Sequence, residues 1–199
     1  MIIVPGQLVS DKPQQGEGVF VEGGKTYAST VGILIEGRVI PLKGQYLPIP
    51  GDYVVGVISE ERFSGYSVEV HSPYEGSLSN KEVRESFKMG DVISAKVIDV
   101  NEIHEPILAE ARLLKGGEVI EIEPVKVPRV IGRNGSMLSV LKEHTKSELF
   151  VGKNGRIYLR GGDTALATLA ILKICREAHT SGLTDRMAEL LTAELKKRG

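Results

Sequence analysis

One short stretch of the sequence, Gly132-Arg133-Asn134-Gly135, has residue types that suit contact with a phosphate backbone. Glycine has no Cβ, so a chain of sugars and phosphates can come close to the peptide backbone at Gly132 and Gly135. The amide groups at the start of a following helix carry partial positive charge, and Arg133 adds a full charge. The residues predicted to contact a nucleic acid here are Arg129, Ile131, Gly132, Arg133, Asn134, Gly135 and Lys142. The alternative is an ordinary helix-turn-helix corner that uses glycine only for its bend.

The segments that flank this turn are predicted to be a strand before it and a helix after it. Residues 118–126 alternate apolar and charged side chains, which predicts a strand that ends before Pro128. Ser136 is expected to cap the helix that follows the turn. Four apolar residues beside the turn are expected to form a shelf for bases: Val130, Ile131, Leu138 and Leu141.

The remainder of the chain completes a recognisable order of elements. Residues 148–151 and 156–159 are predicted to form a hairpin through Gly152-Lys153-Asn154-Gly155, because Asn-Gly favours tight β-turns. A long apolar helix is predicted from Asp163 or Thr164 to Ala178, and a last helix from Thr184 to Arg198. The order strand, helix, turn, helix, strand, strand, helix is that of a type I KH domain, which binds single-stranded nucleic acid at a Gly-x-x-Gly turn.

Basic side chains are concentrated around the same turn. Residues 126–160 carry eight basic side chains and two acidic ones, a net charge of +6, whereas the whole chain has a formal net charge of −1. Such a local cluster of cations is typical of a surface that binds a polyanion. The alternative is a solvated surface whose charges only keep the protein in solution.

Residues 48–115 are predicted to form a five-stranded OB-type barrel, a small closed sheet that binds oligonucleotides on its face and loops. The β-like runs are 51–58, 65–70, 88–100 and 107–113, and Gly76 is expected to precede a polar connection. Aromatic rings that bases could stack on are Phe63, Tyr66, Tyr74 and Phe87, although Phe63 and Phe87 could equally fill the core. The predicted nucleic-acid contacts of the barrel are Arg62, Tyr66, Lys96 and Arg112.

The charge of this segment argues against the barrel as the main binding surface. Residues 48–115 carry seven basic and twelve acidic side chains, a net charge of −5. A negative module repels phosphate over about one Debye length unless its few cations gather on one edge. We therefore expect the principal affinity in the KH segment and a guiding role in the barrel.

Residues 1–47 alternate short β-like runs with turns and carry no cluster of catalytic or polar side chains. This pattern favours a docking or scaffold module. The runs are 2–4, 19–21, 27–35 and 38–42.

Several classes of protein are disfavoured by composition. The single cysteine, Cys175, allows no internal disulfide and fits a reducing compartment. No leader-like segment and no run of about 18 apolar residues is present, which predicts a soluble protein in the cytoplasm with no membrane contact. Scattered carboxylates and four histidines without metal spacing predict no metal, no cofactor and no catalytic residues.

Over nearly its whole length the chain resembles the RNA-binding cap subunits of the archaeal exosome. The resemblance is carried by Val4-Pro5-Gly6 and by residues 26–32, 46–58 and 151–158, the last of which contains the Gly-x-Asn-Gly motif of that family. It implies a chain that is mostly β and then α+β. The implied domains are an N-terminal β domain over 1–47, an S1 barrel over 48–115, and a type I KH domain with an extra C-terminal helix over 116–199.

The resemblance also implies a function and partners. Three such subunits would sit on a six-membered ring of RNase PH-like subunits, docked through the N-terminal domain. The ring would degrade RNA from 3′ to 5′, while the non-catalytic caps recruit single-stranded RNA, with adenine-rich tails as the implied preference. Residues 152–155 would have a structural role as a hairpin tip packed against another domain.

Two other functions stay open at the level of the sequence. One is a transcription elongation or translation factor that couples an S1 barrel to KH modules, although those usually carry further KH copies. The other is a stand-alone nuclease, which would need clustered carboxylates to hold metal ions.

Overall fold

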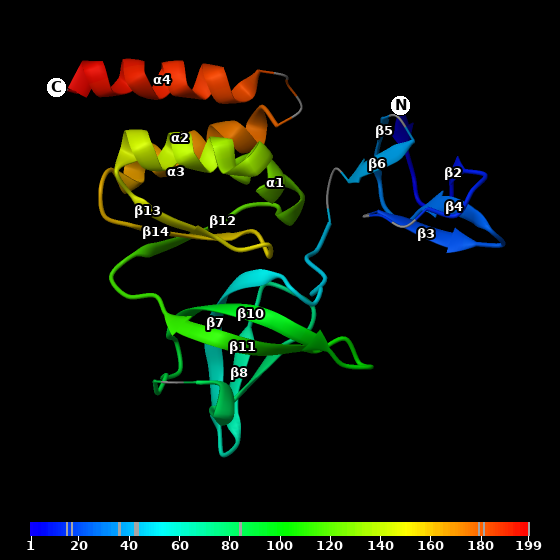
Figure 1. Cartoon of the computed structure of the whole chain (residues 1–199), viewed down its shortest axis with the longest axis horizontal. Helices are drawn as coiled ribbons and strands as arrows, with labels where there is room; N and C mark the ends of the chain where they lie inside the picture. Colours follow the sequence, from blue (N-terminus) through cyan, green and yellow to red (C-terminus); the bar gives the residue numbers. More distant parts are fainter. Residues whose placement is uncertain are drawn as a thin grey trace. The chain divides into compact units, whose positions relative to one another are not determined.

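The computed structural model describes residues 1–14, 16, 18–35, 37–41, 44–83, 85–178, 180 and 182–198. The chain divides into two compact units, Met1–Gln45 and Tyr46–Gly199. The second unit holds a closed β-barrel and a three-stranded sheet with helices over one face (Figure 1). None of the helices among the described residues is long and apolar enough to span a membrane.

The first unit consists of two three-stranded antiparallel sheets, with strand orders β1-β5-β6 and β2-β4-β3. Its buried core is small and contains Ile3, Ala28 and Val39. The strands are β1 (Ile2–Ile3), β2 (Leu8–Ser10), β3 (Val19–Glu22), β4 (Lys25–Ala28), β5 (Gly32–Ile35) and β6 (Arg38–Pro41).

The strands of this unit differ from the prediction at two places. The run predicted over 27–35 is two strands, β4 and β5, because the chain turns after Ala28 and the Ser29 amide bonds to the Gly18 carbonyl at 2.9 Å. Strand β2 was not predicted, since three residues are too few to show an alternating pattern. Leu42, at the end of the run predicted over 38–42, lies outside the described residues.

The barrel closes in the order β10-β11-β9-β8-β7 and confirms the predicted OB-type architecture. All its ladders are antiparallel except that of β9 with β11, which is parallel. Its strands are β7 (Tyr53–Arg62), β8 (Gly65–Glu69), β9 (Gly76–Ser79), β10 (Val92–Val100) and β11 (Pro106–Leu113). A short 3-10 helix, η1 (Asn80–Glu82), follows β9.

The polar connection expected after Gly76 is wrong, because this segment is β9, the barrel strand that the four predicted runs left out. Its one large apolar residue, Leu78, is fully buried, so the strand has a single inward-facing anchor and no visible alternation. A Cβ at Gly76 would lie 2.7 Å from a methyl carbon of Leu108, which explains the glycine. Phe87 lies in the barrel core with 2% of its surface exposed, whereas Phe63 is fully exposed, so the core placement holds for Phe87 alone.

The C-terminal part has the element order of a type I KH domain, as predicted. Its sheet has the antiparallel order β12-β14-β13, and α1, α2 and α3 cover one face. Helix α4 packs on α2, where His144 Nε2 lies 3.2 Å from Thr192 Oγ1. The elements are β12 (Glu118–Glu121), η2 (Pro124–Lys126), α1 (Val127–Ile131), η3 (Arg133–Gly135), α2 (Ser136–Thr145), β13 (Glu148–Val151), β14 (Arg156–Arg160), α3 (Thr164–Arg176) and α4 (Leu183–Arg198).

Two details around the turn differ from prediction. The strand predicted to Lys126 ends at Glu121, because Pro124 opens a 3-10 turn and Pro128 then sits in the first turn of α1, where its missing N–H costs nothing. Ser136 is the first residue of α2 and does not cap it; the cap position is Gly135, with no side-chain bond to the backbone.

The barrel and the sheet are joined through the predicted hairpin tip. The Asn154 side chain is fully buried; its Oδ1 accepts from the Val55 amide at 3.2 Å, and its Nδ2 donates to the carbonyls of Val55 (2.7 Å) and Val70 (2.9 Å). The Lys153 amide also donates to the Tyr53 carbonyl at 2.8 Å. These bonds confirm a structural role for residues 152–155, because the tip gives buried backbone groups of the barrel the hydrogen-bond partners that water would otherwise provide.

Candidate nucleic-acid interface

The corner formed by Gly132–Gly135 joins α1 to α2 through a sharp left-handed path. Gly132 has φ 75° and ψ 172°, Gly135 has φ 77°, and Asn134 between them has φ 51° and ψ 32°. The Gly132 amide ends α1 by donating to the Pro128 carbonyl at 2.9 Å. Asparagine tolerates the left-handed region better than most residues, so the sequence fits this path.

The two glycines serve different purposes. A Cβ at Gly132 would lie 2.6 Å from the Met137 amide nitrogen and 2.9 Å from Ser136 Oγ, so this glycine is required by the fold itself. A Cβ at Gly135 would have nothing within 4 Å. Open space beside the backbone is therefore found at Gly135, while contact of a ligand with Gly132 stays a prediction.

The charged residues predicted at the corner all lie on the surface. Arg129 on α1, Arg133 in the turn and Lys142 on α2 are exposed, as is Asn134. None of these three cations forms an ion pair with a residue that the structure describes, so their charges are free to meet a ligand. Ile131 is partly buried against the core.

The apolar shelf is smaller than predicted. Val130 and Leu141 are fully buried between α1, α2 and the sheet, so neither can touch a base. Ile131 and Leu138 keep part of their surface exposed and remain beside the turn. The spacing of the four residues in the sequence does not show which of them face the core and which stay at the surface.

The barrel residues predicted to touch RNA do not form one group. Arg62 lies at the β7–β8 turn, where its guanidinium bonds to Glu60 at 2.8 Å, and this carboxylate raises the pKa of Arg62. Lys96 lies on β10 and Arg112 on β11, which are neighbouring strands of the barrel. The Tyr66 ring packs edge-on against Phe87 at 5.5 Å, and its hydroxyl accepts from the Phe87 amide at 3.3 Å.

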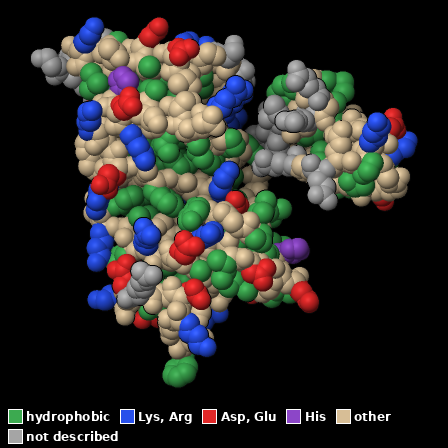
Figure 2. Space-filling model, viewed as in Figure 1, with side chains coloured by type: hydrophobic (Ala, Val, Ile, Leu, Met, Phe, Trp, Pro, Cys, Tyr) green, Lys and Arg blue, Asp and Glu red, His purple; other side chains and the backbone are tan. Residues whose placement is uncertain are grey.

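A cleft between the barrel and the sheet contains residues that the sequence analysis missed. It has a volume of about 430 Å³ and includes Tyr53, Phe150 and Tyr158 as well as Arg112. Figure 2 shows hydrophobic side chains gathered between the sheet and the barrel with basic side chains around them. The alternation of residues 148–151 and 156–160 marks which side chains share a face, but only the hairpin docking shows that this face meets the barrel.

An ion-pair cluster lies at another part of the same junction. Arg156 on β14 bonds from Nη1 to the Glu69 carboxylate of the barrel at 2.6 Å, and from Nε to Glu121 of β12 at 2.9 Å. The hydrogen bond from Arg156 holds the pKa of Glu121 below its usual range. Among the described residues, no three His, Cys, Asp or Glu side chains are placed to share a metal ion.

Comparison with known proteins agrees with this architecture, although no family model matches the chain. The exosome complex component Rrp4 of Pyrococcus furiosus is 40% identical over 227 residues, covering 100% of this chain and 86% of that protein. The protein of the same name from Methanothermus fervidus is 38% identical, covering 98% of this chain and 96% of its own.

A solved structure gives the same result. A crystal structure provisionally described as that of an exosome complex RNA-binding protein is 35% identical, with a TM-score of 0.70, and covers 78% of this chain and 100% of its own. Because these two relatives match at about 40% identity over 98–100% of this chain, the similarity covers nearly all of the elements described above. The chain belongs to the Rrp4 family of exosome complex components.

Proposed function

We propose that this chain is a non-catalytic, RNA-binding cap subunit of an archaeal exosome, which recruits single-stranded RNA and guides its 3′ end to the degrading enzyme. The observation that carries the proposal is the corner at Gly135, where open space at the start of α2 occurs beside exposed cations that form no ion pair with any described residue, in a KH fold. The solved relative is described as an RNA-binding protein of the exosome complex, which supports the same ligand.

The contacts proposed for RNA in the KH domain are Arg129, Ile131, Gly132, Arg133, Asn134, Gly135 and Lys142. In the barrel the first candidate is Arg112, with Arg62, Tyr66 and Lys96 as weaker candidates because their side chains already have partners. The phosphate backbone would supply most of the affinity through the cations, and stacking on partly exposed rings would add to it.

The proposed partners are a hexameric ring of RNase PH-like subunits and two further caps, in the cytoplasm. The N-terminal unit is the proposed docking module. It supports this role with large apolar side chains that are exposed despite its small core: Met1, Ile2, Val4, Leu8, Phe20, Val21, Val31 and Ile35. Exposed apolar surface of this extent is typical of a protein interface.

Replacement of Gly135 tests the KH site with a matched pair of variants. Gly135→Asp should raise the Kd for labelled oligo(A) at least tenfold above that of Gly135→Asn, since both side chains tolerate the left-handed backbone and fill the same space but only Asp repels phosphate. Fluorescence anisotropy measures the Kd. Gly132 is a poor test site, because any Cβ there collides with Met137.

Arg133→Ala should weaken binding to all sequences and reduce the slope of log K against log salt by about 0.7, the value expected for one phosphate contact on a single strand. Arg176→Ala on α3 removes the same charge from an exposed position outside the predicted contacts and serves as the control. If Gly135→Asp and Gly135→Asn bound oligo(A) with the same Kd, and Arg133→Ala bound it as tightly as the parent protein, the affinity would lie outside the KH corner.

A further inference from the structure

The cleft between the barrel and the sheet is lined by side chains from β7, β10 and β11 on one side and from β13 and β14 on the other. We propose that this cleft binds one nucleotide of a single-stranded RNA, with its base against the rings of Tyr53 and Phe150 and its phosphate against Arg112 and Lys115. The proposal rests on the proposed function for the class of ligand, but it concerns a site separate from the Gly-x-x-Gly corner.

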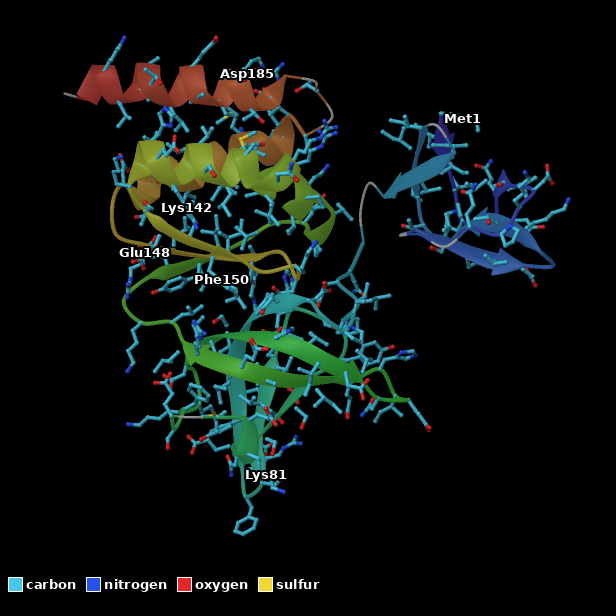
Figure 3. The ribbon with its side chains drawn as sticks, in the orientation of Figure 1. Met1, Lys81, Lys142, Glu148, Phe150 and Asp185 are labelled. Atoms are coloured by element: carbon cyan, nitrogen blue, oxygen red, sulfur yellow. The ribbon has the colours of Figure 1, made fainter. Side chains whose placement is uncertain are left out.

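The aromatic wall follows from the register of the hairpin. Phe150 on β13 lies directly opposite Tyr158 on β14 in the antiparallel ladder. Their neighbours Leu149 and Leu159 are buried among the helices, so alternation turns Phe150 and Tyr158 toward the barrel. Figure 3 shows Phe150 on the barrel side of the sheet.

The rings in this wall differ in how much surface they offer. Tyr158 is 5% exposed, and its hydroxyl donates to the Lys115 carbonyl at 2.6 Å, so it forms the floor. Phe150 is half-buried, and Tyr53, from the barrel, is 45% exposed. Phe150 and Tyr53 are thus partly open, with Lys96 Nζ over one face of Tyr53 at 5.7 Å from the ring centre, and such rings provide a surface on which a base can stack.

The charges of the cleft leave two cations without a partner. Glu148 is paired with Arg160, and Glu110 is paired with Lys96 at 3.3 Å. Arg112 and Lys115 are exposed and form no ion pair with any residue in the described part of the chain. Because both acids are neutralised internally, the charge offered to a ligand is positive.

A β-bulge on β11 lies at the wall of the cleft. Between Ser94 and Lys96 the register on β11 moves from Arg112 to Ala109, so β11 has one extra residue, and Glu110 takes φ 53°. Glu110 and Arg112 both line the cleft, while Ala111 between them packs in the barrel core. A non-glycine residue at positive φ is strained, and such residues and bulges are concentrated at functional sites.

The size and chemistry of the cleft favour a nucleotide over a peptide. Its volume of about 430 Å³ falls in the range of roughly 300–1,000 Å³ typical of small-ligand sites. A docked protein segment would need a longer apolar groove, whereas rings beside unpaired cations match one base and one phosphate.

The chain contains no tryptophan, so one introduced indole reports on the cleft directly. In the full-length Phe150→Trp protein, saturating oligo(A) should reduce the emission at least twofold through base stacking, and a strand of abasic sugar-phosphates should not. Leu169→Trp, at an exposed position on α3, is the control and should change little. Oligo(A) binding is followed in the same samples by anisotropy.

Unchanged indole emission from a Phe150→Trp protein that still binds oligo(A) would overturn the cleft site and leave the proposed function intact. Quenching by polyglutamate as strong as that by oligo(A) would also overturn it, in favour of an acidic peptide. If no variant and no parent protein bound oligo(A), the proposed function itself would fail.

A surface substitution keeps the proposal testable if Phe150→Trp does not fold. Arg112→Ala should raise the Kd for oligo(A) by about threefold to tenfold, while Arg176→Ala, with the same loss of charge, should change it by less than about twofold. Combined with Gly135→Asp, Arg112→Ala should lower affinity further, because the two sites hold different nucleotides of one strand. An identical effect of Arg112→Ala and Arg176→Ala would contradict a local contact.

Discussion

Asn154 is a single side chain that satisfies three backbone groups of the barrel. Its amide bonds to Val55 on both the donor and the acceptor side and to Val70, and its side chain is fully buried. Gly152 beside it has no room for a Cβ, which would lie 2.8 Å from the Val55 amide. The Gly-x-Asn-Gly tip is therefore shaped by the barrel that it contacts.

Asn154→Ala should lower the free energy of unfolding by about 2 kcal/mol or more, because each buried backbone group left unpaired costs about 1–3 kcal/mol. Urea denaturation measures this change. Lys153→Ala is the matched control, since the side chain is exposed and only its backbone amide reaches the barrel. A loss no larger than that of the control would mean that the three hydrogen bonds add nothing to stability.

At the scale of single residues, the sequence identifies this tip and the corner but not the causes of their composition. Both glycines of the corner were predicted to admit a ligand, yet Gly132 is required by contact with Met137 inside the fold. Val130 and Leu141 were predicted at the surface and are core residues. Such distinctions depend on which side of a helix meets the sheet, which a local sequence pattern leaves open.

At the scale of elements, long and periodic segments were predicted and short ones were not. The final helices, the hairpin of β13 and β14 and most of the barrel follow from their apolar spacing. Strand β9 and helix α1 are four and five residues long, too short for a period to appear. Their form is set by neighbours: β9 by its pairing with β8 and β11, and α1 by packing on α2 and α3.

Helix α3 is capped by Asp163, one of the two residues at which the sequence predicted this helix to begin. The Asp163 carboxylate accepts from the Leu166 amide at 2.8 Å. Asp163→Ala should lower the free energy of unfolding by about 1 kcal/mol, whereas Asp163→Asn, which keeps the acceptor, should be nearly neutral. Thermal or urea denaturation distinguishes the two. If Asp163→Asn lowered the free energy of unfolding as much as Asp163→Ala does, the effect would come from the charge of Asp163 and not from its capping hydrogen bond.

At the scale of the whole molecule, the two compact units fit separate tasks. The N-terminal unit has a small core and many exposed apolar side chains, as a docking module needs. The second unit carries both the corner and the cleft, whose free cations suit RNA. The predicted limits of three domains, at 47/48 and 115/116, stay a prediction.

Addition of the chain to an RNase PH-like ring should speed the shortening of a labelled oligo(A) strand in magnesium and phosphate, because captured RNA is delivered to the ring. The chain alone should leave the strand intact. Gel analysis over time measures both rates, with the Gly135→Asp protein as a control that assembles but recruits poorly. Shortening by the lone chain at the rate of the assembly would contradict a non-catalytic role.

The hydrogen bonds at Asn154 have one more consequence, for avidity. The hairpin tip fixes the sheet to the barrel. An RNA bound at the Gly132–Gly135 corner is therefore held at a fixed distance from the cleft, with no flexible linker between the two sites. Neither contact then has to be strong on its own, since the second binding event is intramolecular. Weak binding at two sites suits a protein whose RNA ligand must move along it as the 3′ end is degraded.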